Sequence, residues 1–122
     1  MEWTHPVHLC MSTWYLSRNG PDEGVKAMRE TILRFNAHNG IEMTPERGYH
    51  ETLTVAWLRI VAWELARCPA DLSLPERAGH VIEHCRDMRR LRDHYTRETM
   101  MSWKARTEWV EPDLVPLPKL ER

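Results

Sequence analysis

Two histidines near the start of the chain are spaced so that they could hold one metal ion. His5 and His8 stand three residues apart, which places both imidazoles on one face of a helix. His50 could add a third imidazole from a second helix. Three histidines can hold zinc or iron while leaving coordination positions open. The spacing therefore predicts a divalent transition metal site, with zinc or iron as the ion, at His5, His8 and His50.

Glu51 follows His50 directly and supplies an acid beside this predicted site. Neighbouring helical residues are about 100° apart, so Glu51 could ligate the same ion only if the first turn lies end-on to it. It could instead accept a hydrogen bond from a ligand or act as a general base toward a metal-bound water. We therefore assign Glu51 as the candidate catalytic residue. Thr54 stands where a zinc-protease H-E-x-x-H helix needs its second histidine, which excludes that class.

A rival histidine pair lies later in the chain. His80 and His84 are four residues apart, with Cys85 adjacent and His94 downstream. Their spacing is as suitable for two metal ligands as that of the first pair. No acidic partner accompanies them in the sequence, and they border an arginine-rich face. We therefore interpret this pair as solvated.

The elements that must position these residues are helices. No strand-like alternation, internal repeat or glycine-rich phosphate loop occurs, which predicts an all-α protein in a compact bundle. Four main helices are expected: residues 5–18, a second from Pro21 to the Asn39-Gly40 stop, residues 45–68, and a fourth after Ser73 with its apolar stripe reaching Met88. Thr4 and the Ser73–Glu76 pair predict caps for the first and fourth helices. Thr96 and Ser102 predict caps for short helical turns, the second over residues 103–109.

The third helix should form the centre of the bundle, because its side chains are apolar on nearly every side. Trp57 and Ile60 are expected to be almost fully buried there. Arg59 and Glu64 interrupt the apolar run, so it is not expected to cross a membrane.

The end of the chain should be extended rather than helical. Three prolines alternate with apolar residues within 110–118. Trp109, Leu114 and Leu117 supply apolar surface, so we expect the tail, residues 110–122, to pack across the body as a strap.

Composition indicates a single helical domain over residues 1–122. The formal net charge is -1, from 17 basic and 18 acidic side chains, which predicts no affinity for nucleic acid or membranes. Cys10, Cys68 and Cys85 are an odd number of cysteines and form no C-x-x-C pair, so we expect reduced thiols in a cytoplasmic protein.

Four stretches resemble those of a family of small uncharacterised bacterial helical proteins. They are W-T-H-P-V-H-L at 3–9, R-F-N-A-H-N-G at 34–40, G-Y-H-E-T-L-T at 48–54 and W-V-E-P-D-L-V-P-L-P at 109–118. The resemblance covers most of the chain. It implies that these four stretches form one functional unit.

Two classes of function fit these patterns. The first is a small metal-binding protein, which includes the case of a metal-dependent enzyme acting on a small molecule. The alternative is a noncatalytic interaction module whose six tryptophans form a dimer or partner surface, with a homodimer as one outcome. Elemental analysis of the purified protein separates the two classes.

Overall fold

The computed structural model describes residues 4–119, and within them the chain is all-α, as the sequence predicted. In chain order, the helices are α1 (His5–His38), α2 (Glu51–Arg67), α3 (Leu74–Cys85), the 3-10 helix η1 (Met88–Asp93), α4 (Arg97–Met100) and α5 (Trp103–Thr107). No helix in this part of the chain combines the length and apolar character that crossing a bilayer requires. Three long helices therefore stand where four were expected.

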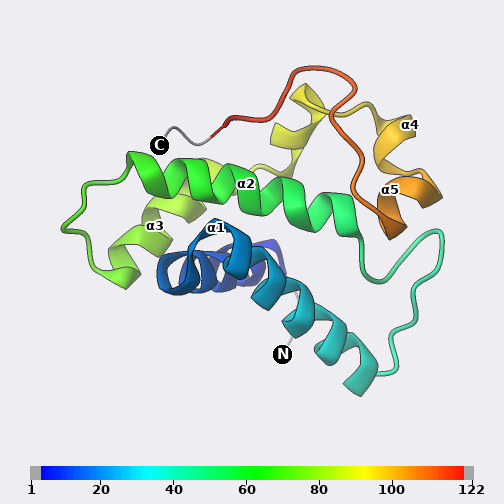
Figure 1. Ribbon diagram of the computed structural model, residues 1–122, viewed down its shortest axis with the longest axis horizontal. Helices are drawn as coiled ribbons and strands as arrows, with labels where there is room; N and C mark the ends of the chain where they lie inside the picture. The colour runs from blue at the N-terminus through cyan, green and yellow to red at the C-terminus, as the bar shows by residue number, and fades with distance from the viewer. Residues whose placement is uncertain (1–3, 120–122) are drawn as a thin grey trace.

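The difference in helix number arises at Gly20. Its φ of 83° and ψ of 176° break the helical backbone, so α1 consists of two helical arms joined at a kink. Glycine adopts positive φ at little cost, and Pro21 has no N–H to continue the hydrogen-bond pattern. Thr4 caps the first arm, because its side chain accepts a hydrogen bond from the Val7 amide. The predicted end of the first helix at residue 18 is thus a change of direction inside α1 (Figure 1).

The central helix begins later than predicted. Thr44 does not cap it, because its hydroxyl and backbone bond to Arg47 and close a local turn instead. Gly48 follows with φ of 93°, and a Cβ there would lie 2.7 Å from the Glu42 carbonyl oxygen. Helix α2 starts only at Glu51, with His50 as its N-cap. The expected start at residue 45 is therefore wrong.

Helix α2 forms the centre of the fold and contacts α1, α3 and α5 (Figure 1). The two residues expected in the core are buried, since Trp57 is 8% exposed and Ile60 is 0% exposed. Glu64 is also buried, although it is charged. A carboxylate in such a position requires partners, because burying an unpaired charge is costly.

Helix α3 begins as predicted and ends early. Ser73 and Glu76 form the reciprocal bonds of a capping box. Val81 and Cys85 are buried, but the helix stops at Cys85. Met88 lies in η1 and is 59% exposed, so its expected place in the apolar stripe is wrong.

The segment after α5 is not helical as far as residue 119, and it passes over α2 and η1 (Figure 1). The Thr52 hydroxyl accepts a hydrogen bond from the Val110 amide, and the Leu114 amide donates to the His94 carbonyl. Leu117 is buried in the core, whereas Leu114 is half exposed and contributes little to packing. The last three residues of the predicted tail, 120–122, lie outside the described residues.

Candidate functional site

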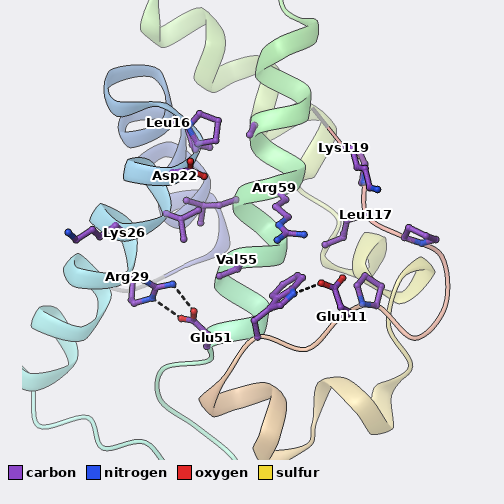
Figure 2. A pocket seen from close by; sticks show the side chains of 18 residues that line it. Leu16, Asp22, Lys26, Arg29, Glu51, Val55, Arg59, Glu111, Leu117 and Lys119 are labelled. Carbon is purple, nitrogen blue, oxygen red and sulfur yellow. Dashed lines mark hydrogen bonds and ion pairs between the residues drawn. The ribbon is translucent and has the colours of Figure 1, made fainter. Parts of the chain in front are cut away.

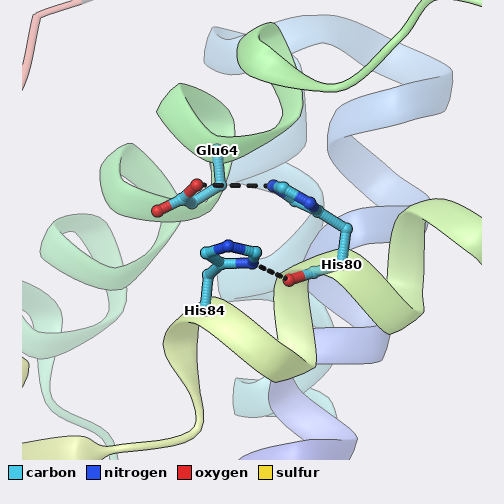
Figure 3. Close-up of side chains that lie close together, drawn as sticks. All are labelled: Glu64, His80 and His84. Carbon is cyan, nitrogen blue, oxygen red and sulfur yellow. Dashed lines mark hydrogen bonds and ion pairs between the residues drawn. The ribbon is translucent and has the colours of Figure 1, made fainter.

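One group of three possible metal-ligating side chains occurs among residues 4–119. It consists of Glu64 on α2 and His80 and His84 on α3, and one ligand atom from each lies within 4.8 Å of the others (Figure 3). The histidines are one turn apart, and their rings stack with centroids separated by 4.1 Å. The glutamate faces them from the neighbouring helix. Two helices thus bring together two imidazoles and one carboxylate.

The hydrogen bond of His84 leaves one of its ring nitrogens able to bind a metal ion. Its Nδ1 lies 2.8 Å from the His80 carbonyl oxygen. A carbonyl only accepts, so Nδ1 carries the hydrogen, and in the neutral ring the lone pair is on Nε2. Histidine ligands in metal sites are commonly oriented by a bond of this kind.

His80 also presents its Nε2 atom. This atom is buried and has no hydrogen-bond partner among residues 4–119. It lies 3.4 Å from Oε1 of Glu64, and the two form an ion pair only if the imidazole is protonated. A buried ring nitrogen without a hydrogen bond is costly, and either a proton or a metal ion would satisfy it.

Arg90 fixes the other oxygen of Glu64. Its Nη1 donates to Oε2 of Glu64 at 2.8 Å and to the His84 carbonyl at 2.9 Å. The Glu64 side chain is 6% exposed and that of Arg90 is 24% exposed, so this is a largely buried ion pair. Because Arg90 occupies Oε2, the carboxylate directs Oε1 toward the histidines.

The three ligand atoms are close to the spacing that a metal requires. Two bonds of about 2.1 Å to one ion span at most about 4.2 Å between ligand atoms. The widest separation allowed by the grouping, 4.8 Å, is slightly larger. His84 is exposed, so its ring can move inward without disturbing the core.

The prediction that His80 and His84 lack an acidic partner is wrong, because Glu64 supplies one from α2. The sequence contained a signal for it, since a glutamate within an apolar helix must be paired if it is buried. His94, by contrast, bonds through Nδ1 to the Val115 carbonyl and is not in the group.

The histidines predicted to bind metal line one cavity, but their ring nitrogens are used differently from that prediction. His50 accepts from the Leu53 amide at Nδ1 and donates from Nε2 to the Met100 carbonyl. Both nitrogens are therefore engaged with the backbone, and none is left for an ion. His5 donates from Nε2 to the Cys85 carbonyl at 2.8 Å, and its ring packs on Trp57. The geometry does not favour a metal site at His5, His8 and His50.

Burial determines the protonation of two of these histidines. It lowers the pKa of His8, and the nearby His5 lowers it further. Burial also lowers the pKa of His50, helped by the charge of Arg106 and opposed by the bond to the Met100 carbonyl. The imidazoles of His8 and His50 are consequently uncharged at neutral pH.

These shifts predict that acid destabilises the fold. The unfolded chain binds protons near pH 6.5, whereas the folded chain binds them only at lower pH, so stability falls as pH drops below about 6.5. Urea unfolding of chelator-treated protein at about pH 7.5 and about pH 5.5 measures the loss. His50→Asn keeps an N-capping side chain and should lose less over this interval. Equal stability of the parent protein at the two pH values would contradict the prediction.

Glu51 lies on a different cavity from the histidines. It accepts hydrogen bonds from Arg29, at 2.9 Å to Oε1 and 2.6 Å to Oε2, and from the Tyr49 hydroxyl. Burial raises the pKa of Glu51, but the bonds from Arg29 and Tyr49 outweigh it and the net pKa is lowered. Both oxygens are occupied, so the geometry does not favour the predicted role of Glu51 as a base beside a histidine-bound metal.

The Glu51–Arg29 pair forms one wall of a groove of about 600 Å³ between α1, α2 and the C-terminal segment (Figure 2). Opposite it, Arg59 lies over the Trp109 ring, and the Trp109 indole donates to Glu111. The groove is lined by both acidic and basic residues, of which Arg29 and Glu51 pair with each other.

The chain matches no protein-family model, no curated protein and no solved structure. The resemblance to small bacterial helical proteins therefore stays a prediction, and the candidate site rests on geometry.

Proposed function

We propose that the protein binds a divalent transition metal ion through Glu64, His80 and His84. The observation that carries this proposal is the convergence of three ligand atoms within 4.8 Å of one another, contributed by two helices. The predicted metal function is thus kept, and its position moves from His5, His8 and His50 to the pair that the sequence left without an acidic partner.

The ligand set favours zinc, with ferrous iron as the second choice. Two imidazoles and one carboxylate hold catalytic zinc in some enzymes and non-haem iron in others. Glu64 and Arg90 cancel each other's charge, so a bound ion would leave the site positive. Arg67 also lines the shallow pocket there, which would add to the attraction for an anionic fourth ligand or hydroxide. An ion in this position would supply a Lewis acid and lower the pKa of bound water.

Calorimetric titration of zinc into reduced, chelator-treated protein tests the proposal. The parent protein should bind one ion per chain. His84→Ala should weaken binding by at least about tenfold, since even changes outside the ligand shell do so in metal sites. The side chain of His84 is exposed, so this variant should fold normally. His38→Ala removes another exposed helical histidine and should leave the affinity unchanged.

Two further variants separate the competing assignments. Glu64→Gln keeps the shape of the side chain and removes the charge, so zinc binding should be lost or strongly weakened. His8→Ala should leave zinc binding intact. Loss of zinc binding in His8→Ala but not in His84→Ala would show that the ion binds at His5, His8 and His50 instead. No binding of zinc or ferrous iron to the parent protein would refute the proposal.

A further inference from the structure

A second cavity, of about 370 Å³, lies between the two arms of α1 and the start of α2. Its walls come from α1, from the turn before α2 and from α2, with Met88 of η1 at the exposed edge. The lining residues are His5, His8, Leu9, Ser12, Met28, Ile32, Gly48, Tyr49, His50, Leu53, Thr54, Trp57, Leu58 and Met88. Protein interiors rarely leave a space much larger than a water molecule unfilled. A space of this size is within the range of small-molecule sites.

The chemistry of the lining is distinctive, because none of these residues is aspartate, glutamate, lysine or arginine. The nearest charged pair, Glu51 and Arg29, lines the other groove. The wall is formed mainly by aliphatic, aromatic and methionine side chains. Transfer of a charged ligand into such surroundings would be unfavourable, because the lining offers no aspartate, glutamate, lysine or arginine and only a few polar groups to replace its hydration.

A few polar groups can orient a ligand. Ser12 is buried and is one of the residues that line the cavity. His5 donates from Nε2 to the Cys85 carbonyl, so in the neutral ring Nδ1 can accept a hydrogen bond. The His5 ring lies 4.6 Å from the Trp57 ring, centroid to centroid, which holds it in place. Apolar walls with a small number of fixed polar groups are typical of small-molecule sites.

We propose that this cavity binds a small, uncharged, largely apolar molecule, the size of one aromatic ring bearing a hydroxyl group. An apolar cavity of about 150 Å³ already accepts benzene, so this one has room for a ring and its substituent. The hydroxyl would hydrogen-bond to His5 or Ser12, and the ring would contact Trp57 and the methionines. The site does not involve Glu64, His80 or His84, so it is independent of the proposed metal function.

Fluorine NMR with three matched probes tests the charge selectivity. The probes are 4-fluorobenzyl alcohol, 4-fluorobenzoate and 4-fluorobenzylammonium, each titrated with chelator-treated protein at pH 8. The alcohol should bind, and both ions should bind at least about tenfold more weakly, as expected when a charge loses its hydration. Equal binding of all three probes, or binding of the ions alone, would overturn the proposal.

Matched leucine variants test the location. Ser12→Leu fills the cavity and should weaken alcohol binding at least about tenfold, whereas Ser17→Leu adds the same side chain to an exposed position of α1 and should not change it. If Ser12→Leu does not fold, changes in the amide chemical shifts of the parent protein on adding the alcohol locate the binding site. The alcohol should shift signals of Ser12 and Trp57, and shifts confined to Arg59 and Trp109 would place it in the groove and refute the proposal. His84→Ala should bind the alcohol normally, which separates this test from that of the metal site.

Discussion

Replacing Arg90 by methionine should lower the free energy of unfolding by about 3 kcal/mol in zinc-free protein, because it leaves Glu64 buried without its cation. Methionine keeps much of the apolar stem of arginine, so lost packing contributes little. Urea unfolding followed by circular dichroism measures the change. Arg92→Met alters an exposed arginine nearby and should change the free energy by less than about 0.5 kcal/mol.

Zinc should restore much of the stability of Arg90→Met, because the proposed ion places positive charge beside the same carboxylate. Ligands that bind only the folded state stabilise it according to their concentration and affinity. The gain should therefore disappear when Arg90→Met is combined with His84→Ala. If Arg90→Met unfolds like the parent protein without zinc, Glu64 does not depend on Arg90 and our account of this pair is wrong.

Ile60→Ala should cost about 2–5 kcal/mol, the usual range when a fully buried aliphatic side chain is truncated. Ile60 is 0% exposed and lies on α2, which contacts three other helices. The midpoint of urea unfolding should fall without a change in slope, since the folded structure is retained. Leu33→Ala truncates an exposed aliphatic residue of α1 and should cost less than about 1 kcal/mol. If the two variants lose similar free energies of unfolding, the placement of Ile60 in the core is wrong.

Much of the fold follows from local sequence signals. The capping box at Ser73 and Glu76 needs only residues three positions apart, so pattern and structure agree there. Trp57 and Ile60 are buried because their helix is apolar on too many sides to lie at the surface. The predicted break between residue 18 and Pro21 is present at Gly20, although it bends α1 rather than ending it.

The start of α2 was predicted too early because other local features outweigh the signal at Thr44 and Pro45. Thr44 and Pro45 form a good helix start by pattern, but the positive φ of Gly48 and the capping by His50 delay α2 to Glu51. Histidine is not among the preferred N-capping residues, so this role could not be expected.

Only two of the three ligands of the candidate metal site could be identified from the sequence. The spacing of His80 and His84 identified two possible ligands, but Glu64 is 16 residues away from His80 and reaches it only through the packing of α2 on α3. His5, His8 and His50 do line one cavity. Bonds from His5 and His50 to the backbone, which spacing cannot reveal, engage Nε2 of His5 and both ring nitrogens of His50.

The most direct test of the metal site is anomalous X-ray diffraction at the zinc absorption edge from crystals grown with zinc. We predict one strong peak about 2.0–2.2 Å from Oε1 of Glu64 and from Nε2 of both His80 and His84. A single peak beside His5 and His8, or no peak at Glu64 in a crystal that contains zinc elsewhere, would contradict the assignment.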